Sequence, residues 1–93
     1  MSDLSKFREE QLADPEFREY FEEMKVADDI ARAIIGGRLA KDWTQKELAL
    51  HSGVSQADIS RYENCEKLPT VPTLKKIAQA LGCTVEVRFV LFE

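Results

Sequence analysis

The segment TQKELALHSGVSQADISRYENCEKLP, residues 44–69, decides the fold of this chain. Thr44 and Glu47 have the spacing of a capping box, which begins a helix. Gly53 ends that helix, because glycine readily adopts the left-handed backbone of a tight stop. Ser55 then caps a second helix. The pattern predicts two short helices around a tight turn, over residues 45–51 and 56–63.

The side chains of this segment divide into a packing set and an outward set. The packing set is apolar and would join the two helices: Leu48, Ala49, Val54, Ile59 and Tyr62. The outward set holds short polar groups and bases with few acids: Gln45, Lys46, Gln56, Ala57, Ser60, Arg61 and Asn64. Such a pair leaves one helix free to enter the DNA major groove while the other crosses the backbone. An ordinary helical hairpin with a solvated polar face is the alternative.

The same positions resemble a known family. The pattern of the XRE helix-turn-helix regulators, which include lambda repressor and Cro, is matched by Thr44-Gln45, Glu47-Leu48-Ala49, Gly53-Val54-Ser55, Ile59-Ser60 and Tyr62-Glu63-Asn64. The resemblance covers residues 26–82 and implies a lambda-repressor-like helix-turn-helix bundle that binds operator DNA as a dimer.

The resemblance also implies roles for single residues. Positions matching Gln45 and Asn64 touch phosphates in the family, helped by helix N-termini. Positions matching Gln56, Ala57 and Ser60-Arg61 face the bases. Lys46 and Lys67 are interpreted as further phosphate contacts that steepen the salt dependence of binding. The predicted DNA-contacting set is Thr44, Gln45, Lys46, Ser55, Gln56, Ala57, Ser60, Arg61, Asn64 and Lys67.

One residue departs from the family pattern. Cys65 stands where the family usually has glycine after Glu-Asn. A cysteine with positive φ would be strained by roughly 1 kcal/mol or more. We therefore expect the turn after the second helix to be adjusted.

The flanking sequence predicts further helices. Asp14-Pro15 is a start signal for a helix over residues 15–24, and a helical period continues over residues 26–41 despite Gly36 and Gly37. A short helix is expected over residues 4–12 and another over 71–81. The expected fold is all-α, with five or six helices and one C-terminal β-strand. The expected divisions are an acidic helical arm (1–25), the helix-turn-helix domain (26–82) and a dimerisation strand (83–93).

The C-terminal stretch TVEVRFVLF, residues 84–92, is rich in β-branched and aromatic residues and predicts a strand. Its first face carries Val85, Val87, Phe89 and Leu91. No second strand is predicted in the chain, so the simplest pairing is with the same strand of a second subunit about a two-fold axis. An irregular tail packed on its own domain is the alternative.

Charge is distributed unevenly along the chain. The formal net charge is −4, but residues 1–30 hold ten acids and four bases, whereas residues 31–93 hold seven acids and nine bases. The acidic arm carries four apolar side chains at helical spacing: Phe17, Tyr20, Phe21 and Met24. These side chains either pack on the domain or form anchors, inside an acidic rim, for a basic protein partner.

A second resemblance favours the partner. Asp14-Pro15-Glu16-Phe17, the helix-turn-helix, and the ending Leu81-Gly82 followed by Val85-Glu86-Val87-Arg88-Phe89 look like small HigA-type antitoxins. That family neutralises a small basic ribonuclease of the HigB/RelE type and represses its own operon. The resemblance implies an antitoxin that is also an autorepressor. The alternatives are a stand-alone XRE-type repressor and a protein-binding adaptor that has lost DNA binding.

Other function classes are disfavoured by inventory. The chain has a single histidine, His51, and two cysteines, which cannot supply the usual four-ligand zinc site. No nucleophile–base–acid set and no phosphate-binding loop is visible, so we expect neither an enzyme nor a cofactor. With no apolar run of about 20 residues and no signal peptide, we expect a cytoplasmic protein whose Cys65 and Cys83 are reduced.

Overall fold

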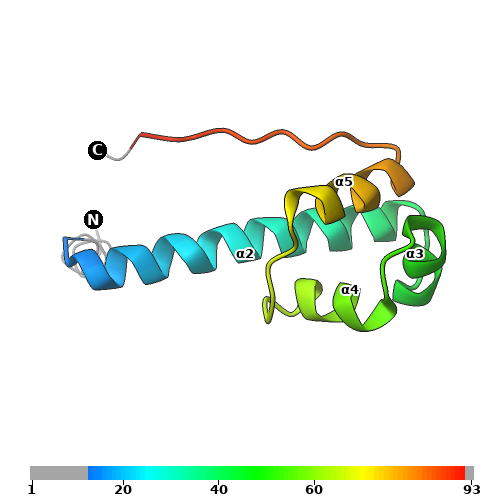
Figure 1. Cartoon of the computed structure of the whole chain (residues 1–93), viewed down its shortest axis with the longest axis horizontal. Coiled ribbons are helices and arrows are strands. Elements are labelled where there is room, and N and C mark those ends of the chain that lie inside the picture. Colours follow the sequence, from blue (N-terminus) through cyan, green and yellow to red (C-terminus); the bar gives the residue numbers. More distant parts are fainter. Residues whose placement is uncertain (1–12, 92–93) are drawn as a thin grey trace.

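The computed structural model describes residues 13–91, in which the chain forms four α-helices (Figure 1). They are α2 (Pro15–Ala40), α3 (Gln45–Ser52), α4 (Gln56–Glu63) and α5 (Val71–Ala80). The C-terminal half of α2 packs with the three short helices, while its N-terminal half extends beyond them (Figure 1). The all-α expectation is confirmed for these residues. The helix expected over residues 4–12, and Phe92 of the expected strand, lie outside the described part.

Helix α2 is one continuous helix, so the expectation of separate helices over 15–24 and 26–41 is wrong. Its start is as predicted, with Pro15 in the first turn and the Asp14 carboxylate accepting a hydrogen bond from the Glu16 backbone N–H at 3.0 Å. No glycine, proline or capping residue stands between the two expected helices, so nothing ends the first one. The proposed boundary between arm and domain therefore lies inside a helix.

The two glycines within α2 have different surroundings. A Cβ at Gly36 would meet nothing within 4 Å. A Cβ at Gly37 would lie 2.7 Å from Cδ1 of Leu81. The missing side chain at Gly37 therefore lets the chain just after α5 pack closely on α2.

The hydrophobic core lies where α2, α3, α4 and α5 meet. Its buried members come from all four helices, the turn between α3 and α4, and the C-cap of α5: Ile34, Leu48, Val54, Ile59, Tyr62, Ile77 and Leu81. Four of the five side chains expected to join the helix pair are among them, and Ala49 packs against the cluster while half-buried. The predicted packing of the helix pair is confirmed.

The expected signals at the ends of α3 and α4 are present. Thr44 and Glu47 form both halves of the capping box, and Gly53 ends α3 with φ 75°. The Ser55 hydroxyl accepts a hydrogen bond from the Asp58 backbone N–H at 3.1 Å and caps α4. These caps limit the turn between the two helices to the residues from Gly53 to Ser55, because each cap fixes where one helix begins or ends.

The turn after α4 is not adjusted, contrary to expectation. Cys65 adopts φ 61°, the left-handed conformation that glycine would adopt without strain. The Cys65 and Glu66 backbone N–H groups donate to the carbonyls of Tyr62 and Arg61, at 3.2 and 2.9 Å. These bonds close the end of α4, so the chain keeps the turn despite the cost of the side chain.

Among the described residues, 84–91 do not form a strand, whereas the sequence predicts a strand over residues 84–92 that pairs with a second subunit. Residues 84–91 are extended and run back alongside α2 (Figure 1), but no strand pairing is present among the described residues. A strand needs a neighbouring strand for its backbone groups, and residues 13–91 provide none. Both thiols, Cys65 and Cys83, are free.

Candidate nucleic-acid interface

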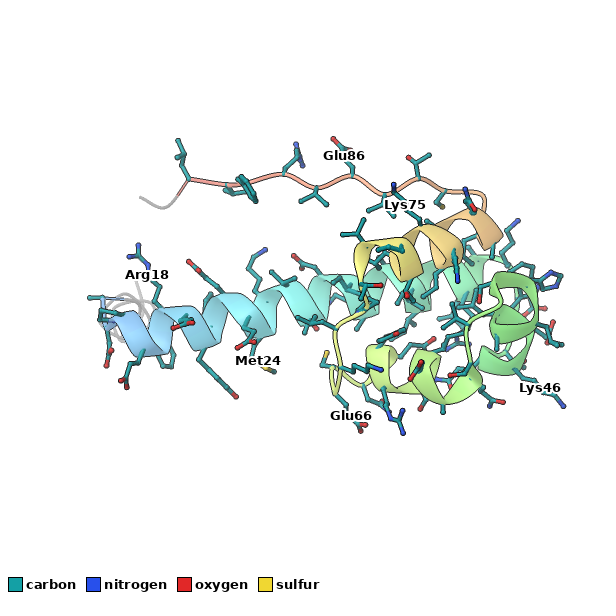
Figure 2. All side chains as sticks on the ribbon, viewed as in Figure 1. Arg18, Met24, Lys46, Glu66, Lys75 and Glu86 are labelled. Carbon is teal, nitrogen blue, oxygen red and sulfur yellow. The ribbon has the colours of Figure 1, made fainter. Side chains whose placement is uncertain are left out.

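The predicted DNA-contacting residues lie on α3, α4 and the turns beside them. Eight of the ten are exposed: Thr44, Lys46, Ser55, Gln56, Ala57, Arg61, Asn64 and Lys67. Gln45 and Ser60 are half-buried. Lys46 on α3 and Glu66 after α4 both project from the edge of the bundle that α3 and α4 form (Figure 2). The first turn of α4 is thus open to solvent, as an inserted helix requires.

Asp58 on α4 lies within ion-pair distance of two of the basic side chains predicted to contact DNA. The Asp58 Oδ1 atom lies 3.2 Å from Arg61 Nη1 and 3.5 Å from Lys67 Nζ. The Asp58 carboxylate therefore competes with a DNA phosphate or base edge for the positive charges of Arg61 and Lys67. Asp58 is not among the residues predicted for this face, although its spacing of three residues from Arg61 is typical of a helical ion pair.

Gln45 is tied to the interior of the helix pair. Its side-chain Nε2 donates to Glu63 Oε1 at 3.1 Å. The amide nitrogen carries a second N–H, which leaves one donor for another acceptor. The contact fixes the start of α3 against the end of α4.

A bidentate ion pair joins α2 to α4. Arg38 Nε and Nη2 donate to the two carboxylate oxygens of Glu63, each at 2.9 Å, and Arg38 Nη1 donates to the Trp43 carbonyl at 3.0 Å. The Arg38 and Glu63 side chains are only 15% and 5% exposed. The hydrogen bonds that Arg38 donates to Glu63 raise the pKa of Arg38; burial partly opposes this shift, and the charge of the same carboxylate reinforces it. This pair holds α4 at a fixed position on the scaffold.

Sequence reasoning missed this ion pair because its members are 25 residues apart. No local spacing rule links Arg38 to Glu63, and both resemble ordinary surface charges in the sequence. The structure shows that Glu63 accepts hydrogen bonds from two helices, through Arg38 and Gln45. Glu63 at the end of α4 thus links α4 to both α2 and α3 by hydrogen bonds.

An aromatic stack joins the turn before α3 to the last turn of α3. The Trp43 and His51 rings are 4.2 Å apart between centroids and nearly parallel, and Lys41 Nζ lies 5.6 Å from the Trp43 ring centroid. Such contacts stiffen the turn between α2 and α3. His51 thus packs against a neighbouring ring.

The arm residues do not pack into the core. The buried residues of α2 are Ala27, Ala31 and Ile34, all in its C-terminal half or middle. Tyr20 and Met24 are 61% and 44% exposed. Phe17 and Phe21 are half-buried and stack on each other, with ring centroids 6.3 Å apart. The alternative in which these side chains pack on the domain is therefore not what the described residues show.

Residues 13–91 contain neither a metal-binding cluster nor a membrane-spanning helix. No three side chains of histidine, cysteine, aspartate or glutamate come together in a way that could hold a metal ion. Within the same range, every helix is too short or too polar to cross a membrane.

Comparison with known proteins gives a consistent result. A family model described as Helix-turn-helix matches residues 37–87. The competence pilus inhibition repressor of Acinetobacter baylyi is 37% identical over 65 residues, which are 70% of this chain and 59% of that protein. The antitoxin HipB of Escherichia coli is 38% identical over 61 residues, 66% of this chain and 69% of HipB. An uncharacterised helix-turn-helix regulator of Sinorhizobium fredii is 41% identical over 55% of this chain and 73% of its own length.

The chain thus spans 59% of the length of the Acinetobacter repressor and somewhat more of the other two. No solved structure is similar enough to count as a match.

Proposed function

The chain belongs to the helix-turn-helix family whose model matches it, and from that premise we propose that it is a sequence-specific DNA-binding repressor with α4 as its reading helix. The observation that carries the proposal is the exposed first turn of α4, which presents Gln56 and Ala57 to solvent beside Arg61. The family is one of DNA-binding regulators and not of enzymes.

We assign roles to four of the predicted contact residues. Gln56 and Arg61 can reach base edges from the major groove, since amide and guanidinium groups make bidentate hydrogen bonds there. Lys46 and Asn64 lie at the margins of the helix pair and suit phosphate oxygens, which set the register of the protein on DNA. The N-terminal ends of α3 and α4 add a favourable dipole toward the phosphates.

A substitution at Arg61 tests the reading helix. Arg61→Ala should weaken binding to a duplex from upstream of the chain's own gene by about tenfold or more, because one such base contact contributes about 1–3 kcal/mol. Binding to a random-sequence duplex should change much less. The matched control is Arg32→Ala on α2, which also loses an arginine paired to an aspartate. Fluorescence anisotropy at fixed salt measures both affinities.

Three outcomes would contradict the proposal in different ways. Equal losses for Arg61→Ala and Arg32→Ala would remove Arg61 from the reading surface. Equal wild-type affinity for the upstream and random duplexes would argue against an operator at that position. A wild-type chain with no salt-dependent DNA affinity would favour the adaptor that has lost DNA binding.

The second part of the proposed function is that the chain neutralises a small basic ribonuclease toxin of the HigB/RelE type. Two observations support an antitoxin role, whereas the ribonuclease type of the toxin comes only from the resemblance to HigA-type antitoxins. The N-terminal half of α2 extends from the bundle with Tyr20 and Met24 exposed among acidic residues. The similar HipB protein is named an antitoxin. Aromatic anchors inside a charged rim are typical of a protein-docking surface.

The test is neutralisation of the basic protein encoded by a neighbouring reading frame, if one exists. The double variant Tyr20→Ala/Met24→Ala should bind that protein at least tenfold more weakly and restore its ribonuclease activity. Leu50→Ala is the control, since Leu50 is an exposed apolar residue on α3. Full neutralisation by the arm variant would overturn the docking role. The lack of such a neighbour would favour a stand-alone repressor.

A further inference from the structure

Residues 84–91 form an extended segment whose backbone hydrogen-bonding groups have no partner among residues 13–91. The last backbone bond before it is from the Cys83 N–H to the Ala78 carbonyl at 2.8 Å. Val87 and Phe89 are 69% and 100% exposed, and Val90 and Leu91 are exposed as well. An extended apolar segment with unpaired backbone groups is a template for pairing with another strand.

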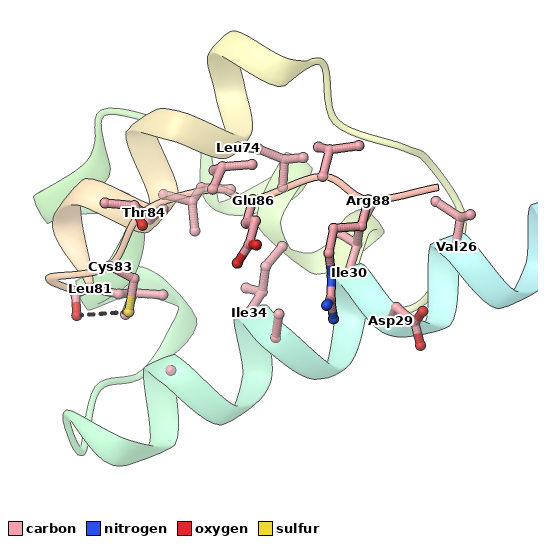
Figure 3. Close-up of a pocket in the computed structure, with 16 residues that line it drawn as sticks. Val26, Asp29, Ile30, Ile34, Leu74, Leu81, Cys83, Thr84, Glu86 and Arg88 are labelled. Carbon is pink, nitrogen blue, oxygen red and sulfur yellow. Dashed lines mark hydrogen bonds between the residues drawn. The ribbon is translucent and has the colours of Figure 1, made fainter. Parts of the chain in front are cut away.

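The surface beside this segment is apolar. A cavity of about 460 Å³ lies between α2, α5 and residues 83–88 (Figure 3). Its walls on the two helices are mainly aliphatic: Val26, Ile30, Ile34, Leu74 and Ile77. A strand pair with one fully apolar face could cover these walls and bury that face.

We propose that a second copy of this chain pairs with the segment, antiparallel and about a two-fold axis centred on Val87. In a symmetric antiparallel pair the central residue lies opposite itself, and residues equally distant from it on either side lie opposite each other. The centre therefore fixes every pair, and each candidate centre can be judged from the sequence of the segment.

Charge selects this centre. With Val87 opposite itself, Glu86 of each copy faces Arg88 of the other, and Val85 faces Phe89. A centre at Glu86 or at Arg88 would place two like charges directly opposite each other, which is destabilising. A centre at Val85 or Phe89 would leave both charges without an opposite charge across the pair. Only a centre at Val87 forms two reciprocal ion pairs.

The same register separates the two faces of the ribbon. The charged pairs share one face with Thr84 and Val90, whereas the other face carries only apolar side chains: Val85, Val87, Phe89 and Leu91. The apolar face is the one that the aliphatic walls of the cavity can bury. The proposal adds a register and a partner to the proposed function and does not depend on DNA binding.

A cysteine at the centre tests the register directly. In the full chain with Cys65→Ser and Cys83→Ser, Val87→Cys should form an intermolecular disulfide on mild oxidation, because opposite residues in an antiparallel pair have Cα atoms about 4.5–5.5 Å apart. Phe89→Cys is the matched control, since it is exposed on the same face. Its two copies would be four residues apart along the pair, about 13 Å, too far for a disulfide.

Charge reversal gives an independent readout by analytical ultracentrifugation. Glu86→Arg alone and Arg88→Glu alone should each shift the wild-type dimer toward monomer, because like charges then face each other. Mixing the two variants should restore the dimer at the wild-type dissociation constant within a few-fold, since every pair is again opposite in charge. The double variant Glu86→Arg/Arg88→Glu should also dimerise.

The results of these experiments distinguish pairing with a second copy from packing of the segment on its own domain. Disulfide formation by Phe89→Cys as fast as by Val87→Cys, or single charge variants that dimerise like wild type, would overturn the register. A wild-type chain that stays monomeric at every concentration would overturn pairing with a second copy and leave the segment packed on its own domain. None of these measurements uses DNA, so failure here is distinguishable from failure of the proposed repressor.

Discussion

Replacing Arg38 with methionine tests whether the Arg38–Glu63 ion pair holds the bundle together. The change leaves the Glu63 carboxylate, only 5% exposed, without the two hydrogen bonds of 2.9 Å that it accepts from the guanidinium. Removing one partner of a buried pair costs about 3–5 kcal/mol, because the remaining charge is left uncompensated. A chain of 93 residues has a free energy of unfolding of about 5–14 kcal/mol. We therefore expect Arg38→Met to lose a large fraction of that stability.

Urea unfolding followed by circular dichroism measures the loss. The control is Arg32→Met: Arg32 pairs with Asp28 at 2.8 Å, but the two side chains are 79% and 52% exposed, so the cost should be about 0.5 kcal/mol or less. Arg38→Met/Glu63→Gln should be more stable than Arg38→Met alone, since it removes the stranded charge. A loss below about 1 kcal/mol for Arg38→Met, or additive losses in the double variant, would refute the reasoning.

The pH dependence of the same pair has a definite sign. The pKa of Arg38 is raised in the folded chain by its hydrogen bond to Glu63. A raised pKa contributes stability that is present below the ordinary pKa of arginine and is lost only as the pH rises through the raised value. The Arg38 side of the pair should therefore add no pH dependence to unfolding near neutral pH.

Three further predictions follow from single sites. Asp58→Asn removes the carboxylate that pairs with Arg61 and Lys67. The slope of log affinity for a random duplex against log salt concentration should therefore steepen by up to about 2, whereas the control Asp28→Asn on α2 should change that slope little. Equal slopes for wild type and Asp58→Asn would contradict the competition between Asp58 and DNA. Cys65→Gly relieves a left-handed residue and should raise the free energy of unfolding by about 1 kcal/mol in urea titrations, and a lower midpoint would contradict the strain. Gly36→Ala should raise the free energy of unfolding by about 1 kcal/mol, because alanine favours a helix over glycine. The free energy of unfolding of Gly37→Ala should be at least about 1 kcal/mol lower than that of Gly36→Ala in the same assay, because the new Cβ would lie 2.7 Å from the Leu81 side chain. Equal values for the two variants would show that Leu81 moves freely out of the way.

Local signals account for the part of the fold that the sequence predicted well. Thr44, Gly53 and Ser55 act on neighbouring backbone groups, so their roles in capping and turning could be recognised from spacing alone. The burial of Leu48 and Ile59 followed from helical periodicity, which needs no knowledge of distant residues. These signals fixed the helix pair and the face that it leaves exposed.

The errors arose where distant residues or absent partners decide the structure. The contact of Arg38 with Glu63 depends on how α2 packs against α4, and no rule of local spacing predicts that packing. Cys65 keeps its left-handed turn because two backbone bonds close the end of α4, an outcome that its own propensity opposes. Residues 84–92 are predicted to be a strand paired with a second subunit, and the described part of a single chain holds no second strand beside them.

The continuity of α2 has a consequence for how the proposed partner and DNA sites could communicate. Met24 and Arg38 lie on one unbroken helix, about 21 Å apart at a rise of 1.5 Å per residue. Arg38 holds Glu63 at the end of α4, so a protein docked at Met24 would have a fixed orientation relative to the reading helix. A flexible linker would decouple the two sites, whereas a hydrogen-bonded helix transmits position. We therefore expect a docked partner to change DNA affinity through its own contacts or clashes with DNA, without ordering a hinge between the sites.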